Sequence, residues 1–180
     1  MTKHIHQTSL HYAPKTNTSC HTTTFQSPLG ELTLLASDKG LAGVWFDGQK
    51  HFPKRINWQR CDANNCPAVL QSAVQQLHDY FAGKLKRFDL PIDLSHGTDF
   101  QQAVWLALLS IPFGNTKSYS AISHIINNPK AVRAVGAAIG KNPIGIIVPC
   151  HRVMGKDGSL TGYAGGIDRK KALLQLEGSL

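Results

Sequence analysis

The hydrophobic pattern of the chain changes its period part-way along, and this change limits the folds that the chain can adopt. Residues 21–46 alternate apolar and polar side chains between two turn signals, Ser27-Pro28-Leu29-Gly30 and Asp38-Lys39-Gly40. Such alternation predicts a meander of about three strands. Farther along, apolar residues recur instead with the helical period of about 3.6 residues. We therefore expect a small strand-bearing half followed by a mainly helical half.

Five helices are predicted, one before and four after a boundary that we place near residue 95. The first starts at Pro67 and ends at Gly83, and the second opens at Thr98 with a capping box. The other three are expected over residues 120–126, 130–139 and 169–177, while 47–66 should be loop and 90–95 an extended connector. The predicted core faces are Leu70, Ala73, Val74, Leu77 and Phe81 in the first helix, Phe100, Val104, Trp105, Leu108 and Leu109 in the second, Ile122, Ile125 and Ile126 in the third, and Val132, Val135 and Ile139 in the fourth. The expected organisation is a flexible leader (1–20), an N-terminal α/β domain (21–95) and a C-terminal domain (96–180).

The chain is basic, and the excess charge favours a polyanionic partner. Its 180 residues carry 19 Lys or Arg against 11 Asp or Glu, a net charge of +8, and the excess is larger after residue 95 than before it. A basic surface is the electrostatic footprint of nucleic-acid binding, although many basic proteins bind none. No apolar run approaches the roughly 20 residues that span a bilayer, so no membrane partner is expected.

The cysteines do not form an evident disulfide or metal pattern. They are Cys20, Cys61, Cys66 and Cys150. Four irregularly spaced cysteines are too few for the disulfide framework of a secreted protein, so we expect a reducing, cytoplasmic setting. Cys61 and Cys66 have four residues between them in a polar loop, which is a poor spacing for zinc. The early histidines are interpreted as leader residues rather than ligands: His4, His6 and His11. We expect no metal and no cofactor.

Two short helices joined by a tight turn at Asn127-Asn128-Pro129 suggest a helix-turn-helix in this basic half. One face of the second helix carries small residues edged by cations: Lys130, Arg133, Ala134, Ala137, Ala138 and Lys141. Alanine is a good helix former, so this face need not be functional. Alternatively, small side chains let the helix lie close to DNA while the cations reach phosphates. Because base-reading side chains are missing from the centre of this face, we expect low sequence selectivity, with the minor groove as the site and Arg133 projecting into the duplex.

The block Pro149-Cys150-His151-Arg152-Val153 follows an apolar run, residues 144–148, that reads as a buried strand. Cationic neighbours stabilise a thiolate, which makes Cys150 a candidate nucleophile, whereas a packed core cysteine would stay protonated and inert. Neighbouring residues of a regular strand point to opposite faces. Cys150 and His151 would therefore need a bridging water or a bend to exchange a proton.

From about residue 22 to residue 178, and most densely after Phe100, the chain resembles the O6-alkylguanine-DNA alkyltransferases, also called methylated-DNA–protein-cysteine methyltransferases. The motifs that carry the resemblance are Asn142-Pro143, the Pro149–Val153 block, Gly162-Tyr163-Ala164-Gly165-Gly166 and the ending Leu173–Gly178. The family implies a ribonuclease-H-like N-terminal domain of α/β form and a mainly α, winged-helix-like C-terminal domain. It also implies direct DNA repair, in which the cysteine takes an alkyl group from guanine O6 and keeps it, so that each molecule acts once.

The resemblance assigns roles residue by residue. Cys150 would be the alkyl acceptor, His151 would draw off its proton through a water, and Glu177 would accept a hydrogen bond from His151. Asn142 would hold a turn against the active-site segment, and Tyr119 would donate to the leaving guanine. Pocket contacts are implied for Val148, Tyr163, Ala164 and Tyr119, and DNA contacts for Arg133, Ala131, Ala134, Gly136, Lys130 and Lys141. Arg133 would fill the stack after the nucleotide turns outward. The expected partner is double-stranded DNA containing O6-alkylguanine, bound by a monomer; whether O4-alkylthymine is also a substrate stays open.

Three other functions remain as alternatives. A binding-only damage sensor would need no reactive cysteine, and Cys150 argues against it. A helix-turn-helix transcription regulator would bind one undamaged operator sequence, which the alanine-rich face does not favour. A cysteine hydrolase would need a separate histidine with its own orienting partner, and none is evident in the sequence.

Overall fold

The computed structural model describes residues 20–53, 58–62 and 65–180. The predicted leader therefore lies outside the described residues, except for Cys20, which begins the first strand. The predictions for His4, His6 and His11 lie outside them as well.

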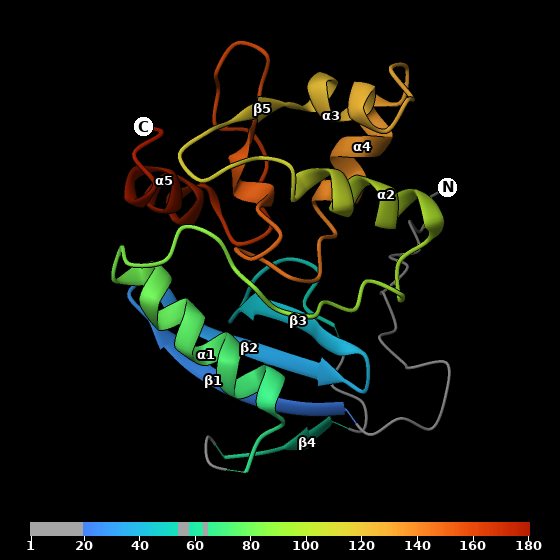
Figure 1. The fold of residues 1–180 in the computed structure, drawn as a ribbon. Helices are drawn as coiled ribbons and strands as arrows, with labels where there is room; N and C mark the ends of the chain where they lie inside the picture. The colour runs from blue at the N-terminus through green and yellow to red at the C-terminus, as the bar shows by residue number, and fades with distance from the viewer. Residues whose placement is uncertain (1–19, 54–57, 63–64) are drawn as a thin grey trace, which may run out of the picture.

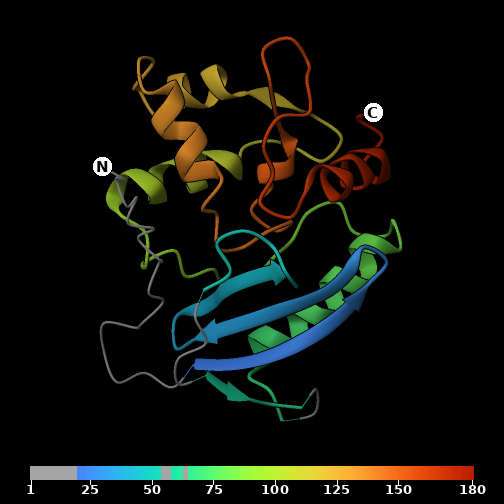
Figure 2. The same ribbon diagram turned by 180° about the vertical axis from the view of Figure 1, so that it is seen from behind.

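The first half of the chain is a four-stranded sheet with one helix against it (Figures 1 and 2). Strands β1 (Cys20–Ser27), β2 (Gly30–Ser37) and β3 (Gly40–Phe46) form the predicted antiparallel meander. The loop predicted over 47–66 is wrong at β4 (Trp58–Arg60), which pairs in parallel with β1 and gives the sheet order β3-β2-β1-β4. Three residues are too few to produce a readable period, so this strand had no sequence signal.

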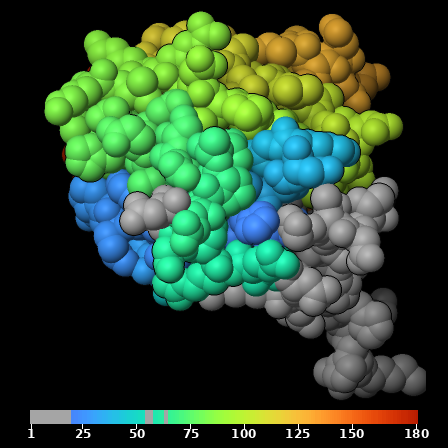
Figure 3. Space-filling view, turned by 60° about the horizontal axis from the view of Figure 1, so that its bottom comes forward, coloured from blue at the N-terminus to red at the C-terminus, as the bar shows by residue number. Residues whose placement is uncertain are grey.

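Helix α1 (Ala68–Phe81) packs on the sheet through its apolar stripe. Leu70, Ala73 and Leu77 are fully buried, as predicted, but so is Tyr80, which has the largest of the fully buried side chains in the described part of the chain. The connector after α1 leads into the second half, and Figure 3 shows the helix and connector forming one continuous surface with the residues that follow. The hydrophobic core is likewise continuous between the two halves.

The second half is mainly helical. It contains α2 (Asp99–Leu108), α3 (Tyr119–Ile125), α4 (Val132–Ile139) and α5 (Ile167–Leu176), with a short 3-10 turn, η1 (Cys150–Arg152). The capping box predicted at Thr98 is present, since its side chain and that of Gln101 each accept from the other residue's backbone amide. Strands β5 (Lys117–Ser118) and β6 (Val153–Met154) pair in parallel and tie the start of α3 to the end of η1.

Four of the predicted burial assignments are wrong, and three of these lie at helix ends. Leu109 and Ile125 are each 43% exposed, and Val132 is 36% exposed. They are the residue after α2, the last residue of α3 and the first residue of α4, where the helical period no longer fixes the direction of a side chain. Ala138, expected on the exposed arc, is buried, and Trp105 Nε1 of α2 donates a hydrogen bond to its carbonyl oxygen at 2.9 Å.

The buried strand predicted over 144–148 is also wrong, because this segment forms consecutive turns. Its one strand-like contact is an isolated bridge between Ile144 and Val44 of β3. The residues are nevertheless buried, apart from the partly exposed Gly145. A short apolar run shows burial but does not distinguish a strand from a buried turn.

Cys61 and Cys66, for which the sequence showed neither a disulfide framework nor a zinc spacing, form a disulfide just before α1. Cys20 and Cys150 are free and buried. Within the described ranges, no group of three or more His, Cys, Asp or Glu side chains is arranged to hold a metal ion. No helix in those ranges is long and apolar enough to cross a membrane.

Candidate active site

Cys150 begins η1, and its side chain is almost fully enclosed, since the residue is only 7% exposed. Its backbone amide donates to the Val148 carbonyl oxygen at 2.8 Å. Burial raises the pKa of the Cys150 thiol, while a hydrogen bond with Asn142 and the charge of Lys170 act in the opposite direction. The thiol therefore stays protonated at neutral pH unless a base takes its proton.

Asn142 shapes the turn that leads to the cysteine. Its Nδ2 donates to the Val148 carbonyl at 2.7 Å, and its Oδ1 accepts from the Ile144 amide at 3.0 Å. Within this turn Ile146 has a φ of 68°, in the left-handed region that a β-branched residue adopts at a cost. The buried amide of Asn142 therefore holds a backbone shape that the local sequence would not favour.

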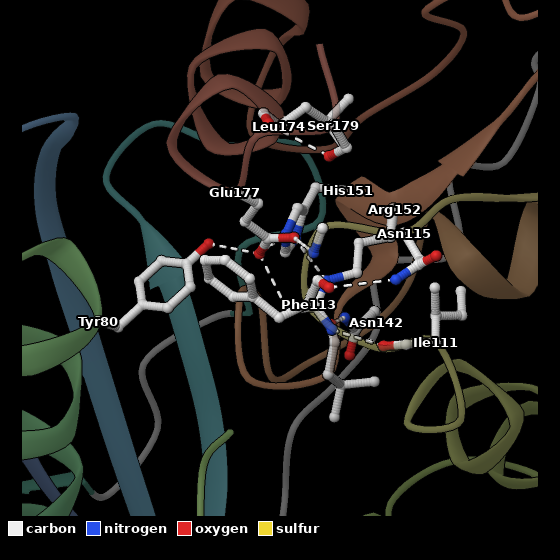
Figure 4. A network of polar contacts seen from close by, with 12 residues as sticks. Tyr80, Ile111, Phe113, Asn115, Asn142, His151, Arg152, Leu174, Glu177 and Ser179 are labelled. Carbon is white, nitrogen blue, oxygen red and sulfur yellow. Dashed lines mark hydrogen bonds and ion pairs between the residues drawn. The ribbon is translucent and has the colours of Figure 1, made fainter. Parts of the chain in front are cut away.

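His151 points away from solvent into a polar network (Figure 4). Its Nε2 lies 2.8 Å from Oε1 of Glu177, and neither side chain has any exposed surface. Burial lowers the pKa of His151, and the nearby carboxylate opposes that effect. Because Nε2 donates to Glu177, the neutral ring carries its lone pair on Nδ1. That Nδ1 atom is buried and has no hydrogen-bond partner among the described residues, so it is the nitrogen able to accept a proton.

Glu177 follows α5 and receives hydrogen bonds from three parts of the chain. Besides His151, Arg152 donates to both carboxylate oxygens, with Nε 2.8 Å from Oε2 and Nη2 2.9 Å from Oε1. The Tyr80 hydroxyl of α1 donates to Oε1 at 2.7 Å, and the Gly114 amide lies 3.4 Å from Oε2. Burial raises the pKa of Glu177, but the hydrogen bonds from His151, Arg152 and Tyr80 outweigh it and bring the pKa to about 2. The carboxylate is therefore ionised throughout the physiological pH range.

Arg152 compensates the charge of the buried Glu177 carboxylate, a role that the sequence did not predict. Besides binding Glu177, its Nη1 donates to the Ile111 carbonyl at 2.6 Å, and its guanidinium lies 5.9 Å from the centre of the Phe113 ring. A buried carboxylate needs compensation of its charge. Arg152 supplies it, so the contact with His151 does not require a protonated imidazole.

Lys170 is a second cation that the sequence reasoning missed. It is fully buried in α5, and its Nζ donates to the carbonyl oxygens of Val153 and Thr161. Burial lowers its pKa to about 8, and the charge of Cys150 acts in the opposite direction. Its position could have been noticed, because Lys170 shares the helix face of Leu173 and Leu174 and interrupts an apolar stripe.

A cavity of about 430 Å³ lies over the Thr161–Ala164 segment, and neither Cys150 nor His151 is among the residues that line it. Tyr119, Tyr163 and Ala164 line it, together with residues from α4 such as Gly136. The Tyr119 hydroxyl donates to the Thr161 carbonyl at 3.1 Å, the same oxygen that Lys170 binds. Burial raises the pKa of Tyr163, and the charge of Cys150 adds to that rise, as expected for a ring close to the thiol.

Val148, expected to contribute to this pocket, is not among the residues that line the cavity. Its side chain is fully buried, and its carbonyl oxygen accepts from Asn142 and from the Cys150 amide. The Cys150 carbonyl accepts from the backbone amide of Val153. Each carbonyl oxygen has two lone pairs, so these bonds use part of its capacity to accept hydrogen bonds.

The first half of the chain also reaches the cavity, which the sequence did not predict. Lys50 and His51 line it, and the Lys50 amide donates to the Ala164 carbonyl at 3.0 Å. His51 has a φ of 62°, a conformation uncommon for residues other than glycine. A positive φ cannot be read from a sequence when no glycine marks it.

Helix α4 lies at the rim of the cavity. Arg133, Ala134 and Ala137 are exposed, as is Lys130 just before the helix. Ala131 precedes its first residue, and Lys141 follows the helix in a partly exposed position. Gly136 faces the Tyr119 ring closely enough that an added Cβ would lie 3.7 Å from it. The exposure predicted for this face of the helix is thus confirmed for Arg133, Ala134 and Ala137. It is wrong for Ala138, which is buried.

Two protein-family models match the chain, one on each half. Residues 20–94 match the ribonuclease-like domain of 6-O-methylguanine DNA methyltransferase, and residues 99–179 match its DNA-binding domain. The methylated-DNA–protein-cysteine methyltransferase of Mycobacterium tuberculosis is 52% identical over 159 residues, covering 88% of this chain and 93% of that protein. The same enzyme of Methanosarcina acetivorans is 47% identical over 156 residues, covering 86% and 96%.

Solved structures agree with this likeness. The crystal structure of Mycobacterium tuberculosis OGT in complex with DNA superposes with a TM-score of 0.80 at 51% identity, covering 88% of this chain and 93% of the other. The two-part architecture expected from the resemblance, a ribonuclease-like sheet domain followed by a helical DNA-binding domain, is therefore confirmed.

Proposed function

The chain belongs to the methylated-DNA–protein-cysteine methyltransferases, and from that premise we propose that Cys150 accepts an alkyl group from O6 of guanine in DNA and keeps it. The protein is thus a DNA-repair methyltransferase that works by alkyl transfer. The proposal adds the residues that perform the transfer and its limit of one event for each molecule.

The proposal rests on how the two ring nitrogens of His151 are hydrogen-bonded. Glu177 binds Nε2 and leaves Nδ1 as the buried atom without a partner among the described residues. A base is needed because burial keeps the Cys150 thiol protonated. His151 Nδ1 takes the thiol proton through a bridging water, and Glu177 stabilises the imidazolium that results.

The transfer forms one bond and breaks another. The Cys150 sulfur attacks the alkyl carbon, a carbon–sulfur bond forms, and the bond between that carbon and guanine O6 breaks. The electron pair stays on the guanine, and the Tyr119 hydroxyl donates to the base as this charge develops. The guanine gains one proton overall, which balances the proton that the thiol gave up. The product is a thioether with no remaining nucleophile, so the protein cannot act again.

The substrate must leave the DNA stack to reach the sulfur, because O6 of a paired guanine is not accessible to a buried thiol. The cavity of about 430 Å³ between Tyr119 and Tyr163 is large enough for one base. The exposed Arg133 fills the space left in the duplex, while Ala131, Ala134 and Gly136 let α4 approach the minor groove and Lys130 and Lys141 contact phosphates. We further propose that the protein acts as a monomer in the cytoplasm. Its binding to DNA should depend little on the DNA sequence.

The test is the stoichiometry of transfer. The protein is mixed with a large excess of duplex DNA that contains O6-methylguanine, and repaired guanine is counted against protein. We expect repair to stop at one guanine for each protein molecule. Continued repair beyond that ratio would refute the single-event mechanism, and no repair would refute the assignment of Cys150.

A further inference from the structure

Tyr80 brings the first half of the chain into contact with the proposed proton relay. It lies in the last turn of α1 and is fully buried. Its hydroxyl donates to Glu177 Oε1 at 2.7 Å, across a separation of 97 residues in the sequence. The contact joins the sheet-bearing half of the protein to the carboxylate that orients His151, as Figure 4 shows.

The ring of Tyr80 is held by other aromatic rings, so its hydroxyl has little freedom to move. The ring centre lies 5.3 Å from that of Phe81, 5.4 Å from that of Phe88 and 6.2 Å from that of Phe113. Phe113 immediately precedes Gly114, whose amide approaches the other oxygen of Glu177. The same packed cluster thus fixes donors to both carboxylate oxygens.

Tyr80 and His151 share a single acceptor atom. Oε1 receives Tyr80 at 2.7 Å, His151 Nε2 at 2.8 Å and Arg152 Nη2 at 2.9 Å. Burial raises the pKa of the Tyr80 hydroxyl, so it remains a donor and never becomes a charge. Each donor withdraws negative charge from the oxygen, and the charge left on Oε1 sets how well it stabilises a protonated His151.

We propose that Tyr80 is a positioning residue that fixes Oε1 of Glu177 and limits the negative charge that this oxygen offers to His151. The inference rests on the relay of the proposed function and adds the N-terminal half of the chain to it. The sheet domain then sets the basicity of His151, and through it the pH at which Cys150 becomes a thiolate.

The test compares Tyr80→Phe with the parent protein, because this change removes only the hydroxyl. Thr22→Val is the matched control, since it removes a side-chain hydrogen bond within the sheet, to the Leu34 carbonyl, without touching Glu177. Two quantities are measured against pH: the rate of Cys150 alkylation by iodoacetamide and the rate of methyl transfer from duplex DNA. Every protein in the comparison also carries Cys20→Ser, so that Cys150 is the free cysteine left to react with iodoacetamide.

Without the Tyr80 hydroxyl, Oε1 keeps more charge and stabilises the imidazolium better. We expect the inflection of both profiles to move to lower pH in Tyr80→Phe. The plateau rate of transfer should fall by about threefold, because a thiolate that forms more readily is less nucleophilic. Thr22→Val should give the parent profile. A Tyr80→Phe profile that superposes on that of the parent would overturn the proposal.

Two further proteins separate this inference from the proposed function. In a Glu177→Gln background, Tyr80→Phe should have no additional effect on either profile, and a persisting shift would overturn the proposal. If Glu177→Gln itself behaves like the parent, the relay fails and the Tyr80 role with it. If Glu177→Gln is slow while Tyr80→Phe is neutral, only the Tyr80 role fails.

Should Tyr80→Phe not fold, 3-fluorotyrosine at position 80 replaces it as the test. Its hydroxyl donates a stronger hydrogen bond to Glu177 and must therefore move the inflection of both profiles to higher pH.

Discussion

His151 and Glu177 are joined by a hydrogen bond of 2.8 Å between Nε2 and Oε1, and both side chains are completely enclosed. Enclosure makes the pair strong and also makes it costly to disturb, because a buried charge that loses its partner has no water to replace it. The pair leaves Nδ1 as the site where a proton can arrive.

Replacing Cys150 with Ser should abolish methyl transfer and leave DNA binding intact, because we expect binding to depend on the exposed cations Lys130 and Arg133, whereas the thiol is buried. Transfer is measured with methylated duplex DNA, and binding with the same duplex after repair. Cys20→Ser, at the other free cysteine, is the control and should keep both activities. Loss of binding together with transfer in Cys150→Ser would contradict the separation.

Glu177 should stabilise the fold in a pH-dependent way. Its pKa in the folded protein, about 2, is below the ordinary value of 4.5, so the ionised side chain stabilises the fold above about pH 4.5, and this effect is lost as the pH falls toward 2. The shift corresponds to something on the order of 3 kcal/mol. Chemical denaturation across this range should show a steep loss of stability in the parent protein and a much flatter profile in Glu177→Gln. Asp168→Asn changes an exposed acid of α5, the helix that precedes Glu177, and should behave like the parent.

Lys170 should favour the thiolate form of Cys150, since a buried cation near a thiol lowers its pKa. In Lys170→Met we expect the pH profile of iodoacetamide alkylation to move to higher pH and methyl transfer at neutral pH to slow by roughly tenfold. Lys171→Met changes the exposed neighbour on the same helix and should have neither effect. Equal profiles for the two variants would mean that Lys170 has only a structural role.

Arg133→Ala should slow repair of duplex DNA by roughly tenfold and leave the reaction with free O6-methylguanine base unchanged, because only the duplex must be opened. Arg87→Ala, which removes an exposed cation from the connector after α1, is the control. An equal loss on both substrates would argue against a role for Arg133 in the vacated stack.

Most of the helices and strands follow from local patterns, because each of these patterns involves residues that are close together in the sequence. The alternation of 21–46 gives the meander, and Thr98 with Gln101 gives the start of α2. The sequence could not distinguish a strand from turns over 144–148, since the deciding contacts come from the Asn142 side chain and from Val44 of β3. Such contacts depend on the fold and leave no local period.

The site was predictable where a residue type stood out and not where a distant partner completes it. Cys150, His151 and Glu177 stand in distinctive motifs, and the structure brings His151 and Glu177 together. Tyr80 was missed because the α1 stripe seemed complete with its aliphatic residues and Phe81, and its acceptor lies 97 residues away. The Cys61–Cys66 disulfide was missed for a similar reason, since a polar loop gives no sign that β4 and the start of α1 bring its ends together.

In the proposed reaction, Cys150 itself becomes the alkyl acceptor. The most direct measurement is mass spectrometry of the protein after one incubation with duplex DNA that contains O6-methylguanine. We expect the peptide containing Cys150 to gain one methyl group in place of one proton, and peptides containing Cys20 to be unchanged. A methyl group on any other residue, or repaired DNA with an unmodified Cys150, would contradict it.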